Sequence, residues 1–285
     1  MEDLSVIRSR YPSAVRLIGA PARALERAGH QGLFYFRSFR DIGHALTGYR
    51  KETIRLVAEM GMGSGALAVI GGTVVIVAFM TLSAGALLAI QGFASLGDIG
   101  VEALTGFFAA FINVRVVVPT TAGIALAATI GAGATAQLGA MRISEEIDAL
   151  EVMAVRSVSY LVSTRVIGGL IAIIPLYSMA VLMSFLSAQF YTTLIAGQSS
   201  GVYNHYFSTF LRPSDLRWSF LQAIVMALTV MLIHCYYGYH AAGGPAGVGE
   251  AVGRAVRASL VSVVMVTLLV SLAIYGTSGD FNLAG

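Results

Sequence analysis

The stretch Arg142-Ile-Ser-Glu-Glu-Ile-Asp-Ala-Leu-Glu-Val-Met153 lies between two long apolar segments and decides how the chain is organised. It holds four of the 15 acidic residues of the chain in one short island. The segments on either side are suited to lipid, whereas the island is suited to water. This pattern indicates an amphipathic helix that connects two membrane spans and can be presented to a soluble partner.

Composition places the chain among membrane proteins. It is 56% hydrophobic and 12% charged, with a mean hydropathy of +0.78, whereas soluble domains carry about 25% charged residues. A membrane span needs about 20 apolar residues. Four segments without Asp, Glu, Lys or Arg reach that length: residues 60–97, 166–211, 218–249 and 258–279.

A further span is expected between Glu102 and Arg142, where Arg115 is the only charged residue. We predict one long span with its core at residues 116–138, preceded by an aromatic extension near the membrane surface. A re-entrant segment before Arg115 is the alternative, since non-helical backbone is tolerated at membrane depth when protein surrounds it. The expected fold is all-α: a polytopic membrane protein with an N-terminal interfacial helix and five transmembrane helices.

The distribution of basic residues predicts the orientation. More than half of the 18 Lys and Arg residues lie at or before Arg55, and the loop with Asp98 and Glu102 has none. The positive-inside rule puts the N-terminus, the island and the loop near Gly243 in the cytoplasm, and five spans then put the C-terminus outside. The sequence pI of about 9.1 follows from these loops, so no nucleic-acid partner is expected.

Residues 1–58 form the predicted cytoplasmic or interfacial region, and residues 59–285 the membrane domain. Aromatic and basic residues alternate in the first part, a pattern typical of a helix lying in the membrane interface. The alternative is a soluble helix packed on the membrane domain. The residues that carry this pattern are Leu33, Phe34, Phe36, Arg37, Phe39 and Arg40.

Three single residues complete the pattern. Arg115 is expected to extend to the outer surface, or else to meet a lipid head group or a protein outside the membrane. The single cysteine, Cys235, falls in a predicted span and is expected to be buried and inert. Within the island, Ser144 suits a helix N-cap, so that the acidic residues after it occupy the first turn, where the helix dipole favours negative charge.

Two motifs resemble one family. The run Gly133-Ala-Thr-Ala-Gln-Leu-Gly-Ala-Met141 together with the island closely resembles the MlaE/YrbE permeases, the membrane subunits of ABC transporters that work with MCE-domain lipid-carrying proteins. The run Gly243-Gly-Pro-Ala-Gly-Val-Gly-Glu-Ala-Val-Gly253 resembles the second Gly-rich signature of that family. The resemblance covers approximately residues 35–278.

The chain departs from the usual family pattern at three places. Many members have Glu where this chain has Gln137, Met-Gly where it has Met153-Ala154, and Pro-Arg where it has Thr164-Arg165. These departures are similar to the actinobacterial YrbE type, in which two different permeases pair. The resemblance therefore implies a heterodimer with a second, non-identical YrbE-type permease.

An ABC permease needs a separate ATPase. A phosphate-binding Walker loop requires Gly-Lys-Ser/Thr, but the only lysine, Lys51, stands between Arg50 and Glu52. We therefore expect no cofactor and no enzyme activity in this chain, and ATP with Mg²⁺ on a partner ATPase. The resemblance makes residues 142–153, approximately, the coupling helix, with these contact residues: Arg142, Glu145, Glu146, Ile147, Asp148, Leu150 and Glu151. Of these, Ile147 and Leu150 share one helical face with Ile143, which can pack on the chain's own spans or on the partner.

The expected substrate is a lipid. The predicted spans lack Asp and Glu, whereas ion-coupled carriers usually keep such a group in their pathway. The resemblance implies import of fatty acids, sterols or related envelope lipids, with Thr73, Val77, Thr81 and Leu87 of the first span as pathway residues. An ATP-independent secondary lipid transporter or channel is the alternative function. A lipid-modifying enzyme is disfavoured because the sequence has no His-Glu-x-x-His motif and no paired intramembrane carboxylates.

Overall fold

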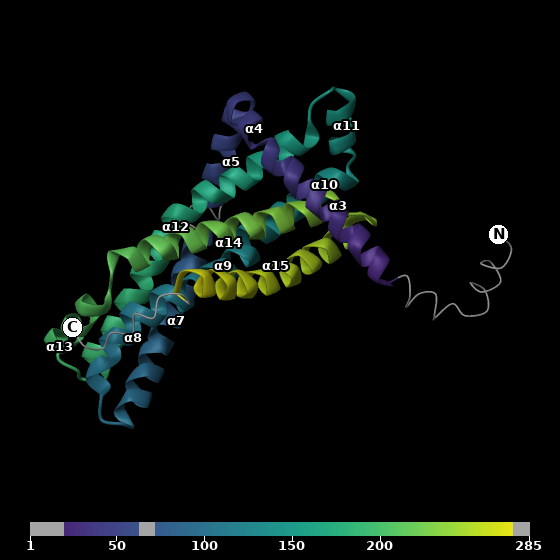
Figure 1. Cartoon of the computed structure of the whole chain (residues 1–285). Coiled ribbons are helices and arrows are strands. Elements are labelled where there is room, and N and C mark those ends of the chain that lie inside the picture. Colours follow the sequence, from purple (N-terminus) through teal and green to yellow (C-terminus); the bar gives the residue numbers. More distant parts are fainter. Residues whose placement is uncertain (1–19, 63–71, 276–285) are drawn as a thin grey trace, which may run out of the picture.

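The computed structural model describes residues 20–62 and 72–275, and the regular elements within those ranges are all helical (Figure 1). Five stretches are long and apolar enough to cross a membrane: Gly72–Gly97, Glu102–Ile143, Val158–Ile195, Pro213–Tyr239 and Gly244–Ile274. The predicted all-α fold with five spans is therefore confirmed. The expected start of the first span near residue 60 lies next to residues 63–71, which are outside the described part.

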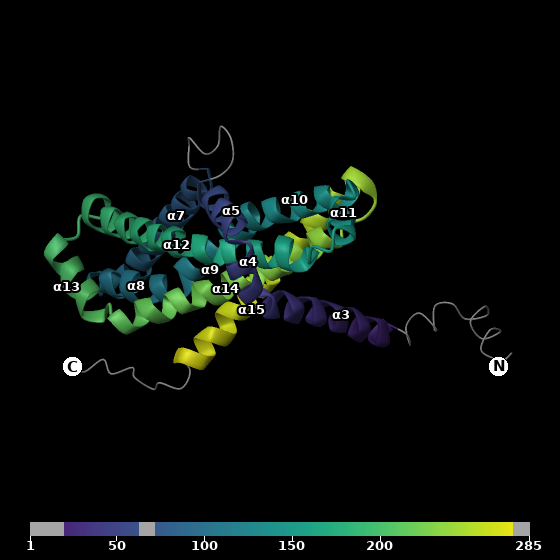
Figure 2. The ribbon, with the colours of Figure 1, turned by 90° about the horizontal axis from the view of Figure 1, so that it is seen from above.

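The spans run between two ends of the molecule. The first is α7 (Gly72–Gly97), the third is mainly α12 (Thr164–Phe190), the fourth is α14 (Pro213–Tyr239) and the fifth is α15 (Gly244–Tyr275). The short helix α11 (Glu146–Val152) joins the second span to the third, and α13 (Ser200–Phe210) joins the third to the fourth. Figure 1 shows α11 and α13 at opposite ends, and in Figure 2 α12 and α14 run side by side between them.

The second span is one continuous run of 42 helical residues, Glu102–Ile143. It consists of α8 (Thr105–Ile112), α9 (Val118–Leu126) and α10 (Ala132–Ile143), with π-helical turns at Asn113–Val117 and Ala127–Gly131. Pro119 lies directly after the first π turn and has no N–H to donate to the preceding turn, which favours this local widening. The alternative of a re-entrant segment before Arg115 is wrong, because the helix is continuous through this region.

Close helix packing holds α7 against α12. A Cβ built on Gly85 would lie 2.5 Å from the backbone oxygen of Ser184, so the two helices approach at a point where only glycine fits. Small residues serve this purpose in membrane proteins because lipid gives helices no hydrophobic reason to associate.

Buried polar contacts join the second, third and fourth spans. Ser184 Oγ donates to Asn113 Oδ1 at 2.8 Å, and Ser219 Oγ donates to the carbonyl of Val114 at 2.9 Å. The hydroxyl of Tyr177 is hydrogen-bonded to that of Ser219. An unpaired polar group costs several kcal/mol in hydrocarbon, on the order of the cost of burying an unpaired amide. These contacts therefore fix the relative positions of the three spans.

Within residues 20–62 the structure has three helices that precede the spans: α3 (Ala20–Arg40), α4 (Ile42–Gly48) and α5 (Arg50–Met62). In α3, Phe34 is buried against the rings of Tyr236 and Tyr239 of α14. On the same helix Phe36 and Phe39 are 66% and 52% exposed. The helix therefore packs on the membrane domain through one face and presents aromatic side chains on another, as a helix in the membrane interface would.

We predict that Gly85→Ala destabilises the bundle by about 1–3 kcal/mol, the usual cost of overpacking, because the new methyl group meets the backbone oxygen of Ser184 as well as the hydroxyl groups of Ser184 and Ser187. The measurement is the thermal unfolding midpoint of the detergent-solubilised protein. Gly97→Ala is the matched control, since a Cβ at Gly97 meets nothing within 4 Å. Equal midpoints for the two variants would contradict the packing described above.

Candidate functional site

The helix in the island is shorter than predicted. It comprises seven residues, Glu146–Val152, and the prediction of Ser144 as its N-cap was wrong. Ser144 instead ends α10, where its Oγ donates to the carbonyl of Ala140 at 3.0 Å. Glu145 is the N-cap residue of α11 and has a left-handed backbone, with φ of 61°. The physical reason is that α10 continues to Ile143, so the chain must turn sharply before the next helix can begin.

The apolar ridge of α11 packs on the chain itself. Ile147 is fully buried in the core of the bundle, and Leu150 is partly buried against the same core. Of the three residues predicted to share a face, only Ile143 on α10 is exposed, at 37%. Ile147 is therefore not available to a partner in this structure.

The exposed apolar residues of this region are at the other end of α11. Val152 is 89% exposed and Met153 is 64% exposed. The helical spacing of the apolar residues did not single them out, because both lie off the Ile147 ridge. Their high exposure at the last turn of a helix whose ridge is already covered distinguishes them from Ile147 and Leu150.

The charged residues of the island divide into three groups. Arg142 forms an ion pair with Asp148 at 2.6 Å, with side chains 38% and 55% exposed. Glu145 and Glu146 are exposed, and Glu146 accepts a hydrogen bond from Ser144 at 2.9 Å. Glu151 instead binds hydroxyl groups of its own chain, as described below. The outward-facing surface is therefore acidic, with an apolar tip.

A strained residue ends α11. Ala154 has φ of 57°, in the left-handed region that glycine adopts at lowest cost. Its N–H donates to the carbonyl of Glu151, and the N–H of Val155 donates to that of Leu150, each at 3.0 Å. This is the hydrogen-bond pattern of a Schellman C-cap, which favours glycine at this position. The Met-Gly of many relatives thus corresponds to a backbone conformation that the chain here adopts with alanine.

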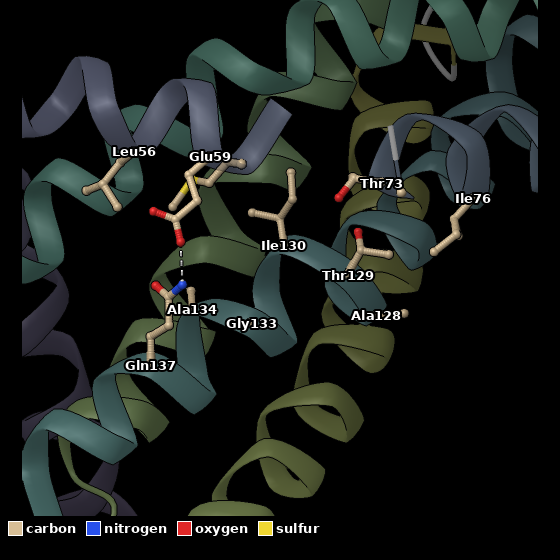
Figure 3. Close-up of a pocket in the computed structure, with 12 residues that line it drawn as sticks. Leu56, Glu59, Thr73, Ile76, Ala128, Thr129, Ile130, Gly133, Ala134 and Gln137 are labelled. Carbon is tan, nitrogen blue, oxygen red and sulfur yellow. Dashed lines mark hydrogen bonds between the residues drawn. The ribbon is translucent and has the colours of Figure 1, made fainter. Parts of the chain in front are cut away.

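The four predicted lipid-pathway residues of α7 do not converge. Val77 and Thr81 are buried within the bundle, and Thr81 donates to the carbonyl of Val77 at 2.8 Å. Leu87 is 64% exposed. Thr73 lines a cavity of about 400 Å³ between α5, α7 and the second span (Figure 3).

The cavity is lined mostly by apolar residues, together with the hydroxyl groups of Thr73 and Thr129 and, at one side, Glu59 and Gln137. There, Gln137 Nε2 donates to Glu59 Oε1 at 2.8 Å, from α10 to α5 (Figure 3). Gln137 Oε1 accepts a long hydrogen bond of 3.4 Å from the buried guanidinium of Arg165. A glutamate at position 137 would place two carboxylates face to face, so the amide of Gln137 matches the presence of Glu59. Near it on α5, a hydrogen bond from Arg55 holds the pKa of Glu52 below its usual value.

Arg115 does not extend to the surface as predicted. Its Nη2 lies 2.9 Å from Asp215 Oδ2, with side chains only 17% and 6% exposed, and its guanidinium lies 3.7 Å from the ring centre of Phe111. Asp215 is in the first turn of α14, where the helix dipole favours a carboxylate. The ion pair thus joins the π turn of the second span to the start of the fourth.

Five packed spans with a short acidic helix at one end define a polytopic helical membrane protein. A family model described as "Permease MlaE" matches residues 62–273. The chain belongs to the MlaE permease family. This confirms the resemblance found in the sequence and makes the protein a multi-pass inner-membrane permease of a lipid-transport family.

Named relatives agree with the family. The intermembrane phospholipid transport system permease protein MlaE of Haemophilus influenzae is 26% identical over 247 residues, which cover 82% of this chain and 90% of the relative. A probable ABC transporter permease protein of Rickettsia bellii is 27% identical over 196 residues, covering 69% and 76%. The chloroplast protein trigalactosyldiacylglycerol 1 of Arabidopsis thaliana is 28% identical over 162 residues, covering 57% and 46%.

We predict that Ala154→Gly stabilises the end of α11 by about 1 kcal/mol, because glycine relieves the left-handed strain. Amide hydrogen exchange of the peptide that contains α11 should slow several-fold. Ala149→Gly is the matched control: Ala149 lies within the same helix, so the same substitution should speed exchange there. Faster exchange in Ala154→Gly would show that the backbone at this position is not left-handed.

A second prediction concerns the ion pair between spans. Asp215→Asn removes the carboxylate that pairs with the largely buried guanidinium of Arg115, and breaking a buried ion pair typically costs about 3–5 kcal/mol. The unfolding midpoint of the solubilised protein should fall clearly, whereas Asp98→Asn, at an exposed carboxylate in the loop after α7, should leave it unchanged. An unchanged midpoint for Asp215→Asn would mean that the pair is not buried in the folded protein.

Proposed function

We propose that this chain is one permease subunit of an ATP-driven lipid transporter that works with MCE-domain proteins outside the membrane. A separate ABC ATPase binds ATP and Mg²⁺, and the island at residues 142–153 is the coupling helix that receives its movement. The observation that carries the proposal is the family match together with an acidic helix whose apolar tip is uncovered.

The surface around α11 has the character of a docking site for a basic groove. Glu145, Glu146 and Asp148 supply negative charge, and Val152 and Met153 supply the apolar contact. Interface energy is concentrated in a few well-packed residues from which water is excluded. We therefore assign the anchoring role to Val152 and Met153, in place of Ile147 and Leu150.

The orientation follows from this role. The ATPase is in the cytoplasm, so α11 and the N-terminal residues 1–58 lie on that side, and the C-terminus lies outside. The charge distribution supports the same orientation. The second permease packs against lipid-exposed faces of this chain, and we propose that it is a non-identical YrbE-type subunit.

The substrate is a lipid, and import of fatty acids, sterols or related envelope lipids is the proposed direction. The cavity lined by Thr73, at about 400 Å³, is large enough for part of an acyl chain or ring system. Its apolar walls, with Glu59 and Gln137 at one side, suit an amphiphile. The alternative, an ATP-independent secondary lipid transporter or channel, would need no acidic docking helix, and lipid movement by the purified chain in vesicles without ATPase would favour it.

Copurification tests the proposal directly. The protein should be extracted from its native membrane with a mild detergent, and the bound proteins and lipids identified by mass spectrometry. We expect an ABC ATPase, a second permease, an MCE-domain protein and lipid. Recovery of the permease without any ABC ATPase would refute the proposed function.

We further predict that the double variant Val152→Asp, Met153→Asp lowers ATPase recovery at least tenfold. Placing a charge in a desolvated contact weakens the binding free energy by about 1.4 kcal/mol or more. The control is Ile99→Asp, at an equally apolar residue that is 72% exposed on the opposite, α13, end. Undiminished ATPase recovery in the double variant would show that the contact lies elsewhere.

A further inference from the structure

Glu151 differs from the other acidic residues of the island in what it binds. Its Oε1 accepts hydrogen bonds from Ser157 Oγ at 2.7 Å and from the hydroxyl of Tyr239 at 3.1 Å. The two hydroxyl oxygens are themselves 2.8 Å apart. The three groups come from three elements: α11, the start of the third span and the last residue of α14.

This cluster connects the coupling helix to the fourth span. Among the described residues, side chains of α11 form hydrogen bonds or ion pairs with Arg142, Ser144, Ser157 and Tyr239. Of these partners only Tyr239 belongs to α14. Hydrogen bonds to a carboxylate are about twice as strong as those between neutral groups, so this contact is the strongest polar link available between the two helices.

Tyr239, at the end of the fourth span, also contacts the N-terminal helix α3. The ring centre of Tyr239 lies 5.5 Å from that of Phe34 on α3 and 5.3 Å from that of His240. A cavity of about 500 Å³ lies beside this cluster. It is lined by residues of α3, of α14 and of the hydrogen-bonded cluster, including His30, Arg37, Glu151, Ser157, Tyr236 and Tyr239. Space beside a hydrogen-bonded cluster allows its members to move together without breaking core packing.

We propose that Glu151 is a positioning residue, which does not contact the ATPase but transmits the movement of α11 to α14 and α3 through the hydroxyl of Tyr239. This inference rests on the proposed function, since it assumes that α11 is moved by an ATPase. Ser157 holds the carboxylate in place from the third span, so that a displacement of α11 is shared between the third and fourth spans.

The test is made on the complete complex reconstituted in vesicles, with ATP hydrolysis, lipid transport and ATPase recovery measured together. Tyr239→Phe removes only the hydroxyl group. We expect normal ATPase recovery and ATP hydrolysis within twofold of the wild type, but about tenfold less lipid transported per ATP, the effect of losing one hydrogen bond to a charged group. Tyr237→Phe is the matched control on the same turn, because no hydrogen bond of its hydroxyl is recorded in the described part of the chain.

A second variant guards against misfolding. Glu151→Gln removes the charge but keeps an oxygen that can accept hydrogen bonds from both hydroxyl groups. It should therefore retain more lipid transport per ATP than Glu151→Ala. Unchanged transport per ATP in Tyr239→Phe, or equal loss in Glu151→Gln and Glu151→Ala, would overturn the proposal. Loss of ATPase recovery in Tyr239→Phe would also overturn it, because the cluster would then belong to the docking surface.

The two proposals fail in different ways. If the Val152 and Met153 double variant loses the ATPase while Tyr239→Phe transports normally, then only the role of Glu151 is wrong. If no ABC ATPase is recovered with the wild-type protein, the proposed function itself is wrong.

Discussion

The attachment of one seven-residue helix to the end of the bundle is the interaction on which the functional surface depends. A helix of this length is not stable alone in water, because nucleation is unfavourable and few hydrogen bonds follow it. Here the burial of Ile147, the hydrogen bonds of Glu151 and the left-handed residues at both ends fix the helix in place. The residues that face away from the bundle are therefore presented in one orientation, as a docking surface requires.

The same constraint explains how the bundle could respond to a force on α11. The helix continues directly from α10, which follows the two π turns of the second span. A π turn has poorer internal packing than the α-helix around it and often lies at functional sites. The first π turn is tied to α12 and α14 by Asn113 and by the Arg115–Asp215 pair. A displacement of α11 along the second span would thus reach the points where three spans are joined by polar contacts.

The spans could be predicted from the sequence because lipid imposes a simple rule on length and charge. Which side of each span faces the protein could not be predicted in the same way. In a membrane the outward face is as apolar as the inward one, so Val77 and Leu87 look alike in the sequence although one is buried and the other is exposed. Thr73 lines a cavity only because α5 and α10 lie beside it. The partner of Arg115 was missed because Asp215 is distant in the chain and lies just outside the uncharged run used to define the fourth span.

The island shows the same limit at smaller scale. The spacing of Ile147 and Leu150 correctly indicates an apolar ridge, but spacing carries no information about whether the ridge meets the chain itself or a partner. The core contact of Ile147 decides this. Helix boundaries are also hard to predict from a sequence. The side chain of Ser144 can cap the start of a helix, but here it lies at the end of α10 and donates a hydrogen bond to the carbonyl of Ala140.

Two of the three departures from the usual family pattern lie at positions whose local geometry bears on them. Gln137 faces Glu59, where a second carboxylate would be repelled. Ala154 occupies a left-handed position that glycine fills in many relatives, at a cost of about 1 kcal/mol. The contact with Glu59 explains Gln137, whereas nothing in the structure explains alanine at position 154. A non-identical second permease is supported by the resemblance to the YrbE type and not by the chemistry of Gln137, since the group that Gln137 complements is supplied by its own α5.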